Sequence, residues 1–230
     1  MDDWIDYYDS AHTIYVNARH RDVHFRVIAE DLAGHIASPA WSVLDYGCGE
    51  ALSAGLVAAR AARLTLVEPA PGVRARIAAR FANQTKIEVA TPDDLAKRPD
   101  ASFDLIIMHS VSQYLTPEEL DATFALLRRL LNPGGLLILG DVLQPHTSAL
   151  TDALALLWFG ARNGFAIAAA FGLLRTFFSH YWRLRSSLGL TRYAEGHMIG
   201  KLAAAGLVAR RADRNIGHNQ SRMTFVARPG

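Results

Sequence analysis

The sequence predicts an α/β protein built on a doubly wound, mostly parallel sheet, with a helical cap insertion after the fifth strand. Two observations predict this class. Over residues 41–142, short apolar runs alternate with helical patterns, and this alternation is typical of parallel βαβ units. After Asp141 the alternation of strands and helices ends, because residues 148–188 carry two apolar helical stretches and no intervening strand. The segments 207–212 and 223–228 then look like an antiparallel pair of strands that closes the sheet.

The individual elements follow from local pattern. Apolar runs predict five strands, at 41–46, 64–68, 86–90, 103–109 and 136–140. The fourth run is apolar enough to be buried on both faces of a sheet. Pro71 in a first turn and Thr116 as an N-cap mark two helix starts. Helical patterns cover 10–35, 51–63, 71–81, 116–131, the two parts of 148–188 on either side of Asn163-Gly164, and 195–205.

The chain shows no repeat and no second core, so we expect a single domain over residues 1–230. Its parts are an N-terminal helical cover (1–40), a ligand-binding core (41–142), the helical cap insertion (148–188), and a closing helix with the antiparallel strand pair (195–230).

Composition limits the class of protein. Half of the 230 residues are apolar and a fifth are charged, which is typical of a globular domain with a buried core. The formal net charge of +2 gives no sign of a nucleic-acid partner. Cys48 is the only cysteine, so an internal disulfide and a multi-cysteine metal site are excluded. The acidic start, Met1 to Trp4, lacks the pattern of a secretory signal, so we expect a cytoplasmic protein.

A glycine turn between the first strand and the next helix carries the chemistry. Gly47 and Gly49 allow the backbone to approach a ligand, and the helix that follows offers free N–H groups. Asp45 ends the strand at the edge where ligands bind in such sheets. A dinucleotide fingerprint requires a third glycine where Leu52 stands, which disfavours a nicotinamide-dependent reductase.

The run from Asp45 to Ala51 resembles the acid-x-Gly-x-Gly-x-Gly signature of class I S-adenosylmethionine-dependent methyltransferases, with Ala51 in place of the third glycine. The segments 103–107 and 130–135 are similar to that family's fourth-strand motif and to its turn before strand five. The resemblance implies a seven-stranded sheet with an antiparallel last strand. It also implies S-adenosylmethionine as methyl donor and S-adenosylhomocysteine as product. The transfer itself would be an in-line displacement at the sulfonium methyl group.

The resemblance also implies site residues. Glu68, 19 positions after Gly49, stands where the family binds both ribose hydroxyls. Asp93 and Asp94 are alternative candidates for the acid near the adenine amino group. His109 follows the fourth strand, and it is either a general base or part of the cofactor pocket wall. The expected cofactor-binding residues are Asp45, Gly47, Cys48, Gly49, Glu68, Pro69, Asp93, Asp94, His109 and Ser110. No helical pair of histidines with ligand spacing occurs, so we expect no metal.

The acceptor is expected to be a small lipophilic molecule, because related enzymes with an insertion after strand five often bind such substrates there. Candidate acceptor contacts are Tyr15, Tyr114, Phe165 and Phe171. The apolar insertion has three interpretations: a lid, an interface in a homodimer, or peripheral contact with the inner membrane surface through 158–185. The alternative to an enzyme is a non-catalytic S-adenosylmethionine-binding or scaffold protein that retains the fold.

Overall fold

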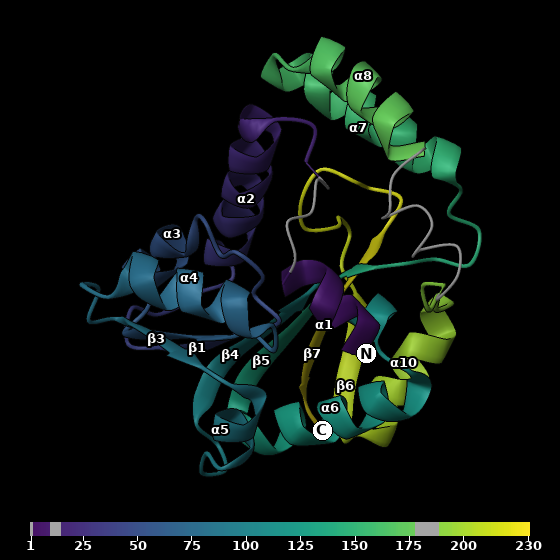
Figure 1. Ribbon diagram of the computed structural model, residues 1–230. Coiled ribbons are helices and arrows are strands. Elements are labelled where there is room, and N and C mark those ends of the chain that lie inside the picture. The colour runs from purple at the N-terminus through teal and green to yellow at the C-terminus, as the bar shows by residue number, and fades with distance from the viewer. Residues whose placement is uncertain (1, 10–14, 178–188) are drawn as a thin grey trace.

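Seven strands form one sheet in the part of the chain that the computed structural model describes, residues 2–9, 15–177 and 189–230. Their order across the sheet is β3-β2-β1-β4-β5-β7-β6 (Figure 1). The first five run parallel, and β7 is antiparallel to both of its neighbours. The predicted fold class is therefore confirmed. The strands are β1 (Ser42–Tyr46), β2 (Arg63–Val67), β3 (Ile87–Ala90), β4 (Phe103–His109), β5 (Leu131–Val142), β6 (Leu207–Arg211) and β7 (Met223–Pro229).

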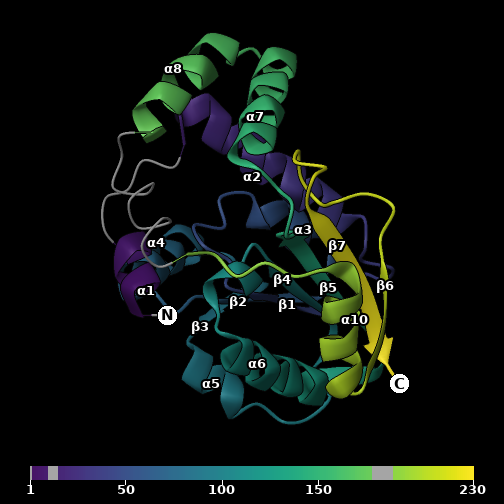
Figure 2. The same ribbon diagram turned by 90° about the vertical axis from the view of Figure 1, so that its right-hand side faces the viewer.

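Helices cover both faces of the sheet, as Figures 1 and 2 show. The central strand β4 explains why: Leu105 and Ile107 belong to one buried cluster, while Ile106 and Met108 belong to the other. A period of two therefore sends apolar side chains to both faces. One cluster includes residues of α2 (Ala18–Ala33), α3 (Ala54–Arg60) and α4 (Pro71–Phe81); the other includes residues of α5 (Pro92–Ala96), α6 (Pro117–Leu130) and α10 (Glu195–Ala204).

The chain order reverses between β1 and β4. From β1 the chain moves outward through β2 and β3, then returns to β4 on the other side of β1 and continues to β5. In parallel sheets of this kind, the carboxyl ends of the strands at such a reversal form a ligand crevice. The topology thus places any site next to Asp45, Glu68 and His109.

Several element boundaries differ from the prediction. The helix expected over 10–35 begins at Ala18, because the side chain of Asn17 accepts a 2.8 Å hydrogen bond from the backbone N–H of His20 and caps it. Residues 10–14 lie outside the described residues. Three short helices were not predicted: α1 (Asp2–Asp9), α5, and the 3₁₀ helix η1 (Ser112–Tyr114).

The fifth strand starts directly after α6, five residues earlier than predicted. Its pairing with β4 jumps from Phe103↔Leu131 to Leu105↔Leu136, so residues 132–135 bulge out of the ladder. Pro133 has no N–H to donate and two glycines follow it, so this stretch cannot pair regularly.

The cap insertion forms an antiparallel helical hairpin, α7 (Ala149–Asn163) and α8 (Ala166–Phe177), which lies beyond α2 at one end of the molecule (Figure 2). The predicted break is confirmed, since Gly164 ends α7 with a left-handed φ of 74°. Residues 178–188 of the expected insertion lie outside the described part. Among the described helices, none is long and apolar enough to cross a membrane.

Candidate functional site

The turn after β1 is held in a conformation that requires glycine at position 47. The N–H groups of Gly47 and Cys48 donate to the carbonyl oxygen of Val67, at 2.8 and 3.2 Å. Gly47 has a φ of 73°, and a Cβ there would lie 2.5 Å from Val111 Cγ2. Gly49 has a φ of 56°, and a Cβ there would meet nothing within 4 Å, so only its backbone conformation favours glycine.

Two carboxylates, those of Asp45 and Glu68, face this turn. Glu68 is 6% exposed; its Oε2 accepts a 2.9 Å hydrogen bond from Gly49 N, and its Oε1 accepts one of the same length from Ala70 N. Burial raises the pKa of Glu68, and these two backbone donors oppose the shift. Burial, then the neighbouring Glu68, raises the pKa of Asp45 to about 7. Two desolvated acids at one turn favour a cationic ligand, because a positive charge would stabilise both ionised forms.

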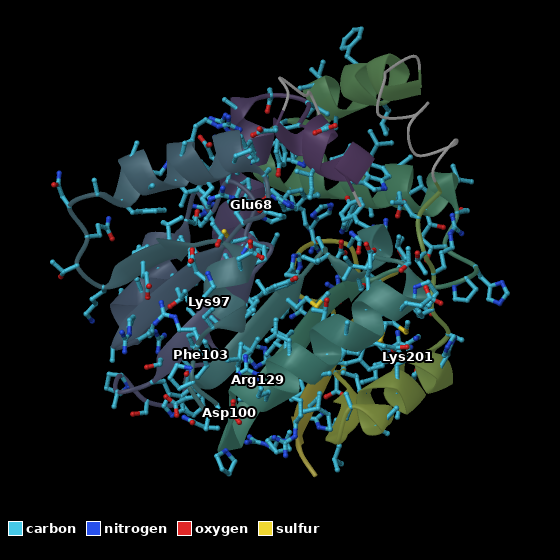
Figure 3. All side chains as sticks on the ribbon, turned by 60° about the horizontal axis from the view of Figure 1, so that its bottom comes forward. Glu68, Lys97, Asp100, Phe103, Arg129 and Lys201 are labelled. Atoms are coloured by element: carbon cyan, nitrogen blue, oxygen red, sulfur yellow. The ribbon has the colours of Figure 1, made fainter. Side chains whose placement is uncertain are left out.

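The site lies at the carboxyl edge of the sheet. Figure 3 shows Glu68 on the cap side, with Phe103 and Asp100 at the opposite end of the molecule. A cavity of about 460 Å³ opens there. Ten of the predicted site residues line it: Asp45, Gly47, Cys48, Gly49, Glu68, Pro69, His109, Ser110, Tyr15 and Tyr114.

Four predicted residues do not reach this cavity: Asp93, Asp94, Phe165 and Phe171. The Asp94 carboxylate instead accepts hydrogen bonds from the N–H and hydroxyl of Thr91 in the capping box of α5. Phe165 is buried in a small cluster with Phe159 and Ala169 between the hairpin and α2. The side chain of Phe171 is 66% exposed on the outer side of α8.

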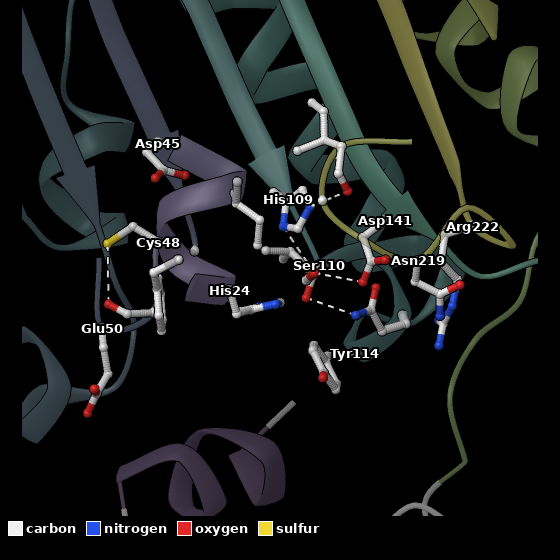
Figure 4. Close-up of a pocket in the computed structure, with 18 of the residues that line it drawn as sticks. His24, Asp45, Cys48, Glu50, His109, Ser110, Tyr114, Asp141, Asn219 and Arg222 are labelled. Carbon is white, nitrogen blue, oxygen red and sulfur yellow. Dashed lines mark hydrogen bonds between the residues drawn. The ribbon is translucent and has the colours of Figure 1, made fainter. Parts of the chain in front are cut away.

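His109, Ser110 and Asp141 form a hydrogen-bonded chain at the adjacent ends of β4 and β5 (Figure 4). Ser110 Oγ donates to Asp141 Oδ2 at 2.7 Å and lies 3.1 Å from His109 Nδ1. The other ring nitrogen, Nε2, lies 3.5 Å from the carbonyl oxygen of Ile216, so protein atoms stand next to both nitrogens of the ring. Burial lowers the pKa of His109, although Asp141 opposes the shift, so the ring is neutral near pH 7.

The loop between β6 and β7 supplies site residues that were not predicted. His218, Asn219 and Arg222 all line the cavity. Because β7 is antiparallel, this loop lies at the same edge as the ends of β4 and β5. The predicted antiparallel pair could have indicated this. Arg222 Nη2 also binds both carboxylate oxygens of Asp152 at 2.8 Å, which ties the loop to the start of α7.

Three histidines pack where the loop, α2 and the hairpin meet. The ring centroids of His20, His24 and His218 lie 5.6–6.4 Å apart. His218 stacks on Phe159 at 4.2 Å, and His20 stacks on Phe165 at 5.1 Å. Burial is the main cause that lowers all three pKa values, that of His20 to about 4. Among the described residues, no group of three potential ligands has the arrangement of a metal site.

Three buried polar atoms in the cavity wall have no hydrogen-bond partner among the described residues. They are Nδ1 of His24, Oε1 of Gln113 and Nε of Arg222. Buried polar atoms are normally paired, so these three mark positions where a bound molecule would supply the partner.

A comparison with known protein families bears on the segment that contains the glycine turn and its two acids. Residues 44–139 match the family described as "Methyltransferase domain". The match covers less than half of the chain, and it includes the glycine turn with Asp45 and Glu68, the residues that would hold S-adenosylmethionine in a methyltransferase. The two carboxylates fit a donor that carries a sulfonium cation. No curated protein sequence is significantly similar to the chain.

Solved structures share the fold of this chain at low sequence identity. DhpI in complex with SAH is 14% identical over all of this chain and 96% of its own, with a TM-score of 0.63. N-methyltransferase NodS from Bradyrhizobium japonicum is 18% identical over 98% of this chain and 95% of its own, with a TM-score of 0.58. The 1,6-didemethyltoxoflavin-N1-methyltransferase of Burkholderia thailandensis is 15% identical over 99% and 86%, with a TM-score of 0.61.

Proposed function

We propose that this protein is an S-adenosylmethionine-dependent methyltransferase that acts on a small, largely lipophilic acceptor bound beside His109. One observation carries the proposal: a single cavity is lined by the glycine turn and its acids and also by the residues beyond β4 and β5. Its volume of about 460 Å³ is in the range of small-molecule sites. The acceptor therefore reaches the methyl group inside the cavity rather than on an open surface.

The glycine turn and the two acids would hold the cofactor. By the family resemblance Glu68 would bind the ribose hydroxyls, and it would then exchange its hydrogen bond from Gly49 N for bonds to the ligand. Asp45 would stabilise the positive end of the cofactor. When bound, S-adenosylmethionine supplies a methyl group on a sulfonium that is a strong leaving group, so the protein's main contribution is to orient the acceptor and exclude water.

His109 would remove the acceptor's proton. Its ring is neutral near pH 7, and Nε2 would exchange its 3.5 Å contact with the Ile216 carbonyl oxygen for the acceptor's proton. Asp141 would act through Ser110 as a positioning residue. A base of this kind is needed for a hydroxyl or acidic carbon acceptor, whereas a neutral amine can attack without one.

The acceptor side of the cavity would bind a mostly apolar molecule that carries a few hydrogen-bonding groups. Phe25, Ile28, Leu143 and Leu156 supply apolar wall. Tyr15, Tyr114, His24 and Gln113 supply hydrogen-bonding groups (Figure 4 shows His24 and Tyr114 directed toward the same space as Ser110). A planar phenol or quinol fits this combination, because aromatic walls and a few polar groups suit a ring that carries a hydroxyl.

The test is a methyl-transfer screen read by mass spectrometry over lipophilic phenols, quinols, fatty acids and amines. Transfer to a phenol or quinol, lost in His109→Gln with cofactor binding retained, would support the proposal. Titration calorimetry with S-adenosylmethionine and with NADH provides the control. Transfer only to amines, independent of His109, would overturn the assigned role of that residue.

A further inference from the structure

Five large apolar side chains of the α7–α8 hairpin are exposed. On α7 the exposed residues recur every four positions, at Leu150, Leu154 and Trp158; on α8 they are Ile167 and Phe171. This spacing places each set along one side of its helix. Their exposed fractions run from 58% for Leu154 to 77% for Ile167. We call these five residues the apolar cap face.

The hairpin's own packing does not use this face. Its inner side already has partners, since Phe159 and Phe165 are buried against α2. The cap face exposes on the order of 600 Å² of apolar side chain, about the upper limit for patches on soluble monomers.

Charge in this part of the sequence points to one partner. Between Asp152 and Glu195 the sequence contains five arginines and no acidic residue, and the structure places Arg162 at the face. Asp152 itself lies toward the core, paired with Arg222. Arg162 lies over the Trp158 ring, 4.8 Å from its centroid. Two copies placed face to face would bring like charges together, whereas an anionic surface would attract them.

We propose that the apolar cap face docks on a bilayer surface that contains anionic phospholipid. Tryptophan with a neighbouring arginine suits the boundary between headgroups and acyl chains, and leucine, isoleucine and phenylalanine enter the apolar layer below. The same helix α7 carries Leu156 to the cavity, so docking brings the membrane next to the acceptor site. This last link rests on the proposed lipophilic acceptor, but docking itself does not.

The test is flotation with vesicles of phosphatidylcholine, either alone or mixed in equal parts with phosphatidylglycerol. We expect the parent to float with the mixed vesicles. Trp158→Ser combined with Phe171→Ser should weaken partitioning about tenfold or more, and Arg162→Glu should weaken it on the mixed vesicles only. The matched control is Val208→Ser, since Val208 is 70% exposed on β6, outside the hairpin, and should not change partitioning.

Two further measurements separate docking from misfolding and from self-association. Cofactor titration confirms that each variant is folded, and its result is independent of vesicle binding. Brominated acyl chains should quench Trp158, measured as the difference between the parent and Trp158→Phe. Absence of flotation overturns the proposal, as does an equal loss in Val208→Ser. A concentration-dependent dimer that the same variants abolish, without vesicle binding, would replace the bilayer by a second copy.

Discussion

The side chain of Ser110 donates a hydrogen bond to that of Asp141, and both residues have left-handed backbone conformations. Their φ angles are 57° and 60°, and the hydrogen bond between them is 2.7 Å long. Such a conformation costs a non-glycine residue about 1–2 kcal/mol. Asn215 helps to maintain it, because its Oδ1 accepts a 3.2 Å hydrogen bond from Asp141 N. Such strain at the ends of two neighbouring strands, inside a cavity wall, is typical of functional sites.

Replacing Ser110 should separate strain from hydrogen bonding. Ser110→Gly relieves the backbone strain, so its free energy of unfolding should exceed that of Ser110→Ala by about 1 kcal/mol, as chemical denaturation measures. Both variants lose the contact with His109, so turnover should fall in both by a similar factor. If turnover instead follows stability, with glycine restoring it, the hydroxyl has no positioning role.

His109→Gln should lower kcat about a hundredfold or more with little change in cofactor affinity, provided that the acceptor is a hydroxyl compound. Burial lowers the pKa of this histidine. The parent's kcat should therefore rise with pH through a value below 6.5 and then stay level, because the neutral ring is the active form. The variant should show no such step. Equal kcat values in parent and variant would contradict the base assignment.

Gly47→Ala should destabilise the fold and abolish cofactor binding. The new methyl group would lie 2.5 Å from Val111 Cγ2 at a φ of 73°. Loss of at least about 2 kcal/mol in unfolding free energy is expected from the combined clash and strain. Gly55→Ala is the matched control, since a Cβ there meets nothing within 4 Å in α3. Chemical denaturation and calorimetry give both readouts, and similar behaviour of the two variants would be a contrary result.

Asp45→Asn should stabilise the ligand-free protein while weakening S-adenosylmethionine binding. A raised pKa means that the folded state holds a proton that the unfolded state releases, so ligand-free stability falls as pH rises from about 4 to 7. The neutral amide removes this fall and should add about 1–3 kcal/mol at pH ~7.5. Unfolding curves across that pH range, with and without cofactor, measure both effects. A variant that is less stable and keeps its affinity would refute the assignment.

The histidine cluster should make the hairpin's packing sensitive to acid. The pKa of His20 is lowered to about 4, and those of His24 and His218 are lowered too, with His109, Asp141, Asp152 and Arg222 as the charged groups around them. Neutral histidines contribute fully above about pH 6.5, and that contribution is lost as pH falls toward about 4. The protection factors of α7 and α8 against hydrogen exchange, corrected for the intrinsic pH dependence of amide exchange, should fall between about pH 6.5 and about pH 5. His20→Leu should reduce this response, and an unchanged response would contradict it.

Local patterns were sufficient for much of the fold. The β4 strand was predicted with its observed ends, because seven residues in a row fit only a strand buried on both faces. The capping box of α6 was predicted as well, since Thr116 and Glu119 bond each other's backbone N–H groups three residues apart. By contrast, α5 was missed although Thr91 and Asp94 form the same box, because five residues are too few to show a helical period.

The sequence by itself determined the cofactor end of the site, because Asp45, Gly47, Gly49 and Glu68 are set by one turn and by the ends of two paired strands. Only the tertiary structure decided the acceptor end. Helical spacing grouped the apolar residues of the insertion, yet it could not distinguish Phe165, which is buried, from Phe171, which faces outward. His218 enters the same cavity from a loop more than a hundred residues after the glycine turn. Such contacts depend on how helices and loops pack across the sheet, and no local periodicity encodes that packing.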